Sequence, residues 1–323
     1  VPGKFSISVR WVFKHRSNFR KFDALVVMSP CHMLTPVLKI FIRKPVILDA
    51  GWSLTDGVLS RGFKFQNLYR LPITFAIDLI SMHSANLVLV ESFLQIVRVQ
   101  KYFALPLRKI RLSYTGLDES QFGSSPELQQ KKNELISELK KRFDLDAKKL
   151  VVLFRGKVNR ESGFENICEA AKLLSNEATF IFILGERDLP PKDLHNIIQL
   201  SKVSPIEMKE IYEMADITIG QISNHPRLKY TIPHKAFEAG YFKRAYITAN
   251  SEGIREIFNE RSVVYLNETN PESLAAAIRA LSNGKNRVKL EIEIGLQYQN
   301  KVSQAVINNQ FAHLIREFAS ELS

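Results

Sequence analysis

The sequence predicts an α/β protein in which two doubly wound parallel-sheet domains follow one another, and three observations support this fold class. The chain has 323 residues, whereas a single hydrophobic core usually supports no more than about 250–300 residues. Short apolar runs alternate with segments of helical period, the order expected for parallel strands joined by crossover helices. Most of these runs are continuously apolar, which is typical of strands covered on both faces.

The strands are placed by those apolar runs. Each run is rich in branched or aromatic residues and is bounded by polar or turn-forming ones. A further short strand is expected at the start of the segment Lys202–Asp216, before its helix. The main strands are expected at Ala24–Met28, Pro45–Leu48, Leu87–Val90, Ile110–Tyr114, Leu150–Phe154, Thr179–Leu184, Ile217–Ile219, Ala245–Thr248 and Val263–Tyr265.

The helices are indicated by their apolar period and by residues that favour helix ends. We expect helices at Phe164–Ser175, Pro205–Met214 and Pro271–Leu281, the last opened by Asn270 as a cap and a first-turn proline. The final stretch, Lys289–Ser323, is another long helical pattern. Its apolar residues fall roughly on one face: Val302, Val306, Phe311, Leu314 and Phe318.

A change in composition between Gly116 and Leu150 marks a boundary between domains. A short Gly/Ser/Pro stretch is followed there by a strongly charged helical segment, interpreted as a linker or packing helix. We therefore expect a first domain over residues 1–125, a linker helix over 126–149, a second domain over 150–288 and a C-terminal helical segment over 289–323.

The charge of the chain predicts an anionic partner. The formal net charge is +12, and residues 1–120 carry 17 of the 45 Lys and Arg but 7 of the 33 Asp and Glu, a net +10. The mean hydropathy of −0.10 excludes a mainly membrane-embedded protein, and the Gly and Pro content excludes collagen-like and low-complexity chains. Two distant cysteines, Cys31 and Cys168, argue against a disulfide framework or structural zinc and for a reducing, cytosolic environment.

The first part of the chain is basic and aromatic together. Its cations are interleaved with Phe5, Trp11, Val12, Phe13 and Phe19, and this pattern predicts a cationic amphipathic surface. Anionic lipid attracts such surfaces. Nucleic acid is a competing partner, ranked lower because no recognised nucleic-acid module is present, and a merely solvated basic surface is the third interpretation. The cations are Lys4, Arg10, Lys14, Arg16, Arg20 and Lys21.

The most apolar long window, Leu71–Val90, is interpreted as a core helix followed by a buried strand. A membrane span is disfavoured because the window contains Asp78, His83, Ser84 and Asn86, which are costly in lipid.

The loop after Leu150–Phe154 is a candidate phosphate site. Gly156 and Gly163 bracket it, it holds Arg155, Lys157 and Arg160, and a helix follows it. Free backbone N–H groups, a helix dipole and cations suit a phosphate, although a plain turn with solvated basic residues remains the alternative. The glycine order is that of neither a Walker loop nor a dinucleotide fingerprint. Gly185, which ends the next strand, lies beside a ligand or in an ordinary turn.

The segment Pro233–Gly240 is a second candidate. If Pro233 begins a helix, the helix N-terminus and Lys235 point together at an anion. Glu238 then lies one turn on, where its carboxylate accepts ribose hydroxyls or forms an intrahelical ion pair with Lys235. His225 and His234 are the nearest histidines, each a donor to substrate or a solvated loop residue. We find no spacing of His, Cys and carboxylates that indicates a metal site, and no nucleophile elbow.

The order of these segments resembles the group 1 family of retaining glycosyltransferases with the GT-B fold. Over about residues 145–285 the chain supplies the family's Gly-basic loop, its strand ending in Gly and its P-x-K-x-x-E helix start. The matching residues are Gly156-Lys157, Gly185, Tyr212 with Asp216, Pro233–Ala239, and Gly253 with Glu256-Ile257. Phe22–Pro30, Lys44–Trp52, Ala85–Ser92 and Lys109–Phe122 resemble the second half of the family's acceptor domain, so we expect an incomplete N-terminal domain.

The resemblance implies a donor site for a nucleotide-diphosphate sugar, without metal or other cofactor. Lys157 takes the position of the phosphate-binding basic residue and Glu238 that of the ribose-binding glutamate. Ser162 stands where the family has a second phosphate lysine, leaving Arg160 as its substitute, and Tyr230 stands where the family has its first glutamate. The implied donor-binding residues are Gly156, Lys157, Arg160, Gly185, His234, Lys235 and Glu238; of these Lys157, Arg160 and Lys235 would stabilise the departing diphosphate.

The predicted function is therefore transfer of a sugar, with retention, from a UDP- or GDP-sugar to a glycan or glycolipid, in polysaccharide biosynthesis at the cytosolic face of the inner membrane. Asp49 and Trp52 are candidate acceptor contacts, with a turn and a half-buried indole as their alternative. Two other functions stay open: a catalytically inactive GT-B protein that binds nucleotide, and a basic nucleic-acid-binding protein.

Overall fold

The computed structural model describes residues 5–61, 69–122, 141, 145–146, 148–186, 188, 190–191 and 194–321. The chain forms two compact units, Val1–Thr115 and Gly116–Ser323, which are taken here one at a time. The linker helix expected over 126–149 falls mostly outside the described residues, as does Lys4.

The first unit is built on a parallel sheet in the order β1-β2-β3-β4. In each pair the strands run side by side in register, for example Val27 opposite Leu48 and Leu48 opposite Val88. The strands are β1 (Leu25–Met28), β2 (Val46–Gly51), β3 (Leu87–Val90) and β4 (Ile110–Leu112), each close to its expected position. Its helices are α1 (Phe5–Phe19), α2 (Leu34–Phe41), α3 (Leu54–Leu59), α5 (Arg70–Ser84) and α6 (Phe93–Phe103), with a 3-10 turn at Leu107–Lys109.

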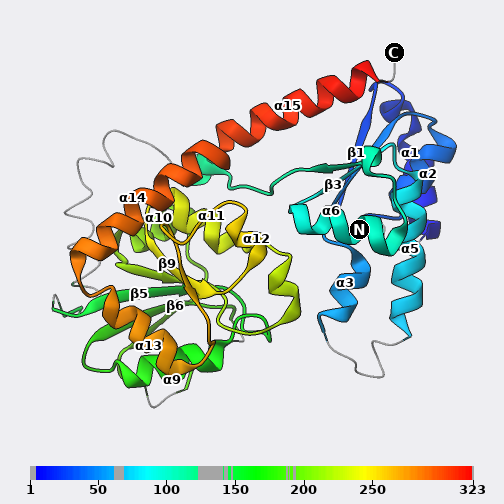
Figure 1. Ribbon diagram of the computed structural model, residues 1–323. Coiled ribbons are helices and arrows are strands. Elements are labelled where there is room, and N and C mark those ends of the chain that lie inside the picture. The colour runs from blue at the N-terminus through cyan, green and yellow to red at the C-terminus, as the bar shows by residue number, and fades with distance from the viewer. Residues whose placement is uncertain are drawn as a thin grey trace. The chain divides into compact units, whose positions relative to one another are not determined.

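One face of this sheet is covered by α1, α2, α5 and α6. Alternate residues of all four strands share a single core with side chains from these helices, which is possible only if the helices lie on the same side. The core includes Val12 of α1, Val37 of α2, Met82 of α5 and Val99 of α6. Figure 1 shows α1, α2 and α5 along one side of this unit.

Helix α5 corrects one expectation. The window Leu71–Val90 does fold as a helix and a fully buried strand, but the helix is not a core helix. It buries Asp78, Ser81 and Met82, whereas Ile73 and Ile80 are 56% and 52% exposed. Within the described ranges, no helix has both the length and the hydropathy needed to cross a membrane.

Asp78 is the reason for this orientation. Its carboxylate accepts hydrogen bonds from the backbone N–H groups of Leu54 (3.2 Å) and Thr55 (2.8 Å), and from the Thr55 hydroxyl (2.6 Å), at the start of α3. The ring of His32 lies beside it, with Nε2 3.8 Å from the carboxylate, and both side chains are fully buried. Burial raises the pKa of Asp78 and lowers the pKa of His32. The charge of each group opposes the effect of burial on the other, but burial is the larger effect for both.

The second unit contains a six-stranded parallel sheet in the order β10-β9-β8-β5-β6-β7. Read from the first strand, the chain runs outward through β6 and β7, then returns to the other side of β5 for β8, β9 and β10. This is the dinucleotide-fold order, whose switch point lies between β5 and β8. The strands are β5 (Leu150–Arg155), β6 (Ala178–Ile183), β7 (Ile197–Leu200), β8 (Ile217–Ile219), β9 (Ala245–Ala249) and β10 (Val264–Leu266).

Helices cover both faces of this sheet, with α9 and α13 on one side and α10, α11 and α14 on the other (Figure 1). Two begin as expected: Ser204 caps α10 directly before Pro205 and forms a capping box with Glu207, and Asn270 accepts from the N–H of Ser273 at 2.8 Å. The helices are α9 (Phe164–Leu173), α10 (Pro205–Met214), α11 (His234–Tyr241), α12 (Glu252–Arg255), α13 (Pro271–Ala280), α14 (Gly284–Lys301) and α15 (Gln304–Ser320), with 3-10 turns at Glu119–Phe122 and Pro226–Lys229.

Two expectations for this unit were wrong in detail. The short strand expected just after Lys202 lies earlier, as β7, and the single helix expected from Lys289 is two helices, α14 and α15. The break falls at Val302 and Ser303, where Ser303 is the N-cap of the second helix. Val302, just before α15, is fully buried and Phe318 nearly so, whereas the other residues of the expected apolar face, Val306, Phe311 and Leu314, are half-buried.

Candidate functional site

The candidate site lies at the carboxyl ends of β5 and β8, the switch point of the second sheet. Gly156 follows β5 directly, Gly220 follows β8, and α11 begins nearby at His234. Lys235 joins the three elements: its Nζ lies 4.1 Å from the centre of the Phe154 ring and donates to the carbonyl of Gly220 at 3.4 Å. A ligand of a doubly wound sheet binds at such a point.

Gly156 makes room for the Lys235 ammonium. A Cβ at this position would lie 3.0 Å from Cε and 3.2 Å from Nζ of that lysine, and the backbone has φ +151°, which favours glycine. Burial lowers the pKa of Lys235 to about 7; Glu238 opposes that shift and Arg155 adds to it. With this pKa the neutral amine of Lys235 would gain a proton when an anion approaches and raises the pKa.

Glu238 is held by three partners rather than by Lys235. Its Oε1 accepts from Arg155 and lies 3.2 Å from Nδ1 of His234, and its Oε2 accepts from the Tyr212 hydroxyl at 2.5 Å. The residue is 1% exposed. Burial alone would raise the pKa of Glu238, but the His234 hydrogen bond, the Arg155 charge and the Tyr212 hydrogen bond hold it below its usual value. The carboxylate is therefore ionised and already engaged.

The loop after β5 carries Lys157 and Arg160, both exposed, and packs against the segment around Ile222. Gly163 (φ +62°) sits against the backbone of Ile222, whose N–H donates to the Ser162 carbonyl at 2.9 Å. An ion pair between Glu161 and Arg227 (2.8 Å) ties the same two segments together. The two exposed cations thus project from a loop whose base is anchored.

Ser162 has a local structural role. Its hydroxyl donates to the carbonyl of Asn159 at 2.7 Å and accepts from the Asn159 N–H at 3.1 Å, and the residue is 1% exposed. It closes the turn and does not reach toward the loop surface as a lysine would. Arg160 is therefore the second cation of this loop that faces solvent.

Two other predicted residues lie at the edge of this region. Gly185 is exposed after β6, and the Asp188 carboxylate beyond it accepts from the N–H of Val158 at 3.2 Å, which links the loops after β5 and β6. His225 caps a 3-10 turn, since its Nδ1 accepts from the N–H of Arg227 at 3.3 Å.

The acceptor candidates belong to the first unit. β2 runs on to Gly51, so Asp49 lies within the strand and not in the loop after it. Its carbonyl accepts from the N–H of Ser29 at 2.9 Å, and burial raises the pKa of its half-buried side chain. Trp52 directly follows the strand and is half-buried.

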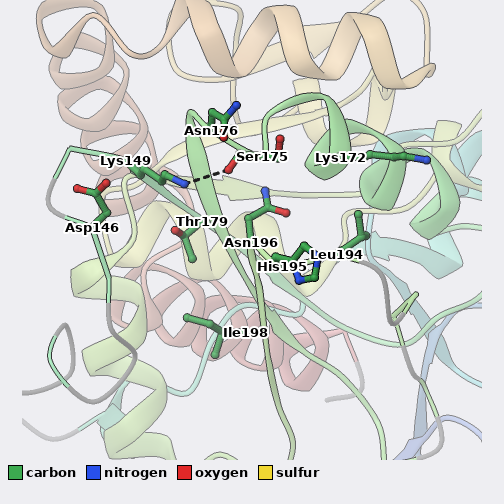
Figure 2. Close-up of a pocket in the computed structure, with 10 residues that line it drawn as sticks. All are labelled: Asp146, Lys149, Lys172, Ser175, Asn176, Thr179, Leu194, His195, Asn196 and Ile198. Atoms are coloured by element: carbon green, nitrogen blue, oxygen red, sulfur yellow. Dashed lines mark hydrogen bonds between the residues drawn. The ribbon is translucent and has the colours of Figure 1, made fainter.

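A cavity of about 560 Å³ opens elsewhere in the second unit, at the amino ends of β5, β6 and β7 (Figure 2). Lys149 spans one side of it and donates to the Ser175 carbonyl at 3.0 Å, and Asn196 bonds to the carbonyls of Ala171 and Ala178. None of the predicted site residues lines it. This cavity lies at the opposite strand ends from the candidate site.

Sequence reasoning placed Arg155 in the candidate phosphate loop and Tyr212 in a family motif, but it assigned neither of them as a partner of Glu238, which both contact. The signal for Arg155 was its place directly before Gly156 at a strand end. In the described part of the chain, no three His, Cys, Asp or Glu residues are grouped as metal ligands would be.

A family model matches the second unit. Residues 136–294 match the family described as glycosyl transferases group 1. That range includes the anchored loop, Lys235 and Glu238. No curated protein sequence is similar enough to this chain to count as a match.

Solved structures share the fold of the whole chain. HepE of Anabaena in complex with UDP is 14% identical, with a TM-score of 0.73 over 95% of this chain and 82% of that one. Sucrose-phosphate synthase from Thermosynechococcus elongatus is 15% identical, with a TM-score of 0.74 over 98% and 79%. A glycosyltransferase from Rickettsia africae is 14% identical, with a TM-score of 0.70 over 98% and 83%. Residues 136–294 thus match the group 1 glycosyltransferase family, and the chain as a whole has the GT-B fold.

Proposed function

We propose that this protein is a glycosyltransferase that moves a hexose from a nucleotide-diphosphate sugar to a glycan or glycolipid acceptor, with retention, in the cytoplasm at the inner face of a membrane. The family match supports sugar transfer. HepE, which shares the fold, is also known in complex with UDP-glucose. In this proposal the donor is a substrate and no metal or other cofactor takes part.

The observation that carries the proposal is the placement of Lys235 at the switch point. Its ammonium contacts the end of β5 and the end of β8 at once, beside the N-terminus of α11. Anions bind where helix N-termini and cations converge. We assign the diphosphate to this place, between Lys235 and the loop that bears Lys157 and Arg160.

The same groups would act on the reaction. The departing diphosphate gains negative charge as the glycosidic bond breaks, and fixed cations and N–H groups stabilise that charge without reorganising. Glu238 would hold ribose hydroxyls through a lone pair that its three partners leave over, and His234 and Gly185 would border the donor. Asp49 and Trp52 remain our candidates for acceptor contact.

The test is to titrate the full chain with UDP, GDP and their sugars by calorimetry, and to assay sugar release and transfer in parallel. Saturable binding of one nucleotide, with turnover of its sugar, is the expected result. If neither nucleotide binds, the assignment of the donor site is wrong.

The lowered pKa of Lys235 predicts that nucleotide binding is coupled to proton uptake. With a pKa of about 7, the Lys235 side chain is mostly the neutral amine at pH 8. Because a bound diphosphate raises that pKa, binding of UDP should take up about one proton. At pH 6 the lysine is already charged and the uptake should vanish. Calorimetric titration in two buffers of different ionisation enthalpy measures it. Lys235→Met should abolish the uptake, whereas Lys157→Met should weaken binding and keep it.

A catalytically inactive, nucleotide-binding protein is the second candidate function. Two observations favour it: the Ser162 hydroxyl is hydrogen-bonded within its own turn, and the Glu238 carboxylate is already ion-paired with Arg155. Binding of nucleotide by the full chain without any turnover of a panel of UDP- and GDP-sugars would select this candidate over the enzyme.

A further inference from the structure

We propose that the first unit docks on a lipid bilayer containing anionic lipid, through the outward side of α1, α2 and α5, called here the outer helical face. Such docking rests on the proposed function, because it would bring the enzyme to a lipid-linked acceptor in the bilayer. Binding to vesicles can nevertheless be measured without any sugar transfer.

The helices of the outer helical face carry exposed cations and no exposed carboxylate, and the exposed Asp23 lies beyond them, after the turn that follows α1. The four helices α1, α2, α5 and α6 contain one acidic residue, Asp78, and it is fully buried. No ion pair joins the cations of α1 and the turn after it to any described carboxylate, and all of them are exposed. They are Arg10, Lys14, Arg16, Arg20 and Lys21.

The same face is unusually apolar. On α5 the inward side takes Asp78 and Ser81, so Ile73 and Ile80, seven residues apart, both point outward. Ile40 at the end of α2 is 60% exposed, more than either of these two. A water-exposed helix normally has the opposite arrangement, with its apolar side inward.

These features belong to one continuous surface. α2 packs between α1 and α5, and all three share the core under the sheet face described above. The rings of Phe13 on α1 and Phe41 on α2 are 4.8 Å apart, and the two side chains are 45% and 38% exposed. Cations and apolar side chains are therefore presented together.

A bilayer fits this combination better than other anionic partners. Exposed aliphatic and aromatic side chains enter the boundary between headgroups and acyl chains, while the cations meet anionic headgroups. A nucleic acid would use the cations but would leave Ile73 and Ile80 in water. The lack of exposed carboxylates on these helices also limits repulsion from the membrane charge.

The charge contribution is tested by flotation of the full chain with vesicles of phosphatidylcholine alone and of phosphatidylcholine mixed equally with phosphatidylglycerol. We expect binding to the mixed vesicles only, weakening as salt rises. The double variant Arg10→Gln, Lys14→Gln should bind about 30-fold more weakly, since each basic residue contributes about fivefold at such a surface. The matched control is Lys285→Gln, Lys289→Gln, also exposed and four apart on one helix, and should change binding less than about twofold.

The apolar contribution is tested by Ile73→Ser, Ile80→Ser, which should weaken vesicle binding at least about tenfold. Its control is Val288→Ser, Ile292→Ser on α14, where the exposed fractions are 49% and 55%, and binding should be unchanged. Equal losses in variants and controls would overturn the proposal, as would tighter binding to a duplex oligonucleotide than to mixed vesicles. UDP affinity should stay constant in all four variants, so failure of docking is separable from failure of the donor site.

Discussion

Replacing Gly163 by alanine should unfold the donor loop and lower the free energy of unfolding of the second unit by more than about 3 kcal/mol. A Cβ there would lie 1.7 Å from the carbonyl oxygen of Ile222 and 2.3 Å from its carbon, so backbone has to move. The φ of +62° adds strain for any residue with a side chain. Because Ile222 also bonds to Ser162, the displaced loop should lose its hold on Lys157 and with it UDP binding.

Urea denaturation followed by circular dichroism measures this loss. Both tryptophans, Trp11 and Trp52, lie in the first unit, so tryptophan emission should keep its normal midpoint and serve as an internal control. Gly284→Ala is the matched control, because nothing lies within 4 Å of its added Cβ at the start of α14; its effect should stay within about 1 kcal/mol. An unchanged midpoint for Gly163→Ala would show that the loop is not packed as described.

Replacing Arg155 by leucine should cost about 3 kcal/mol of stability at neutral pH, since it leaves the buried Glu238 carboxylate without its cation. We place the loss at the lower end for buried pairs because the Arg155 side chain is 38% exposed. Arg279→Leu is the control. Arg279 makes three hydrogen bonds with Glu177 at about half exposure, and its loss should cost under about 1 kcal/mol.

The pH dependence of stability is a second test of the ion pair between Arg155 and Glu238. The pKa of Glu238 is depressed in the folded chain, so its contribution to stability is present above the unfolded pKa of about 4.5 and is lost as pH falls through the lower folded value. Without Arg155, burial dominates and the folded pKa should rise. The gap between Arg155→Leu and the unaltered protein should therefore be widest near pH 7, narrow once pH falls below the raised pKa of the variant, and close as pH falls through the depressed folded pKa of Glu238. A gap that does not depend on pH would argue that Glu238 is neutral in the folded state.

The fold was predictable wherever strands are covered on both sides. β5, β8 and β9 are central, fully or mostly buried, and begin at the expected residues. β7 was misplaced because it is the edge of its sheet and only partly buried, so it lacks the continuous apolar run on which the prediction depended. The break at Ser303 was missed because the apolar period continues across it.

The candidate site was predictable in position but not in its contacts. Loop order and glycine placement brought Gly156 and Lys235 to one sheet end, as the structure has them. The partners of Glu238 were not predictable, since Arg155 is 83 residues away and meets it only through the folded sheet. At a distance of three residues Lys235 was the obvious partner, yet it turns instead to Phe154.

Asp78 has a consequence for how α5 could evolve. Exchanging this carboxylate for leucine would remove three hydrogen bonds to the start of α3 and leave the contact between His83 and the carbonyl of Phe103 to hold the helix. The buried side of α5 could then be fully apolar around Met82, and Ile73 and Ile80 would no longer be held outward by a carboxylate that has to lie inside. A helix free to turn would lose the fixed presentation of these two isoleucines to lipid.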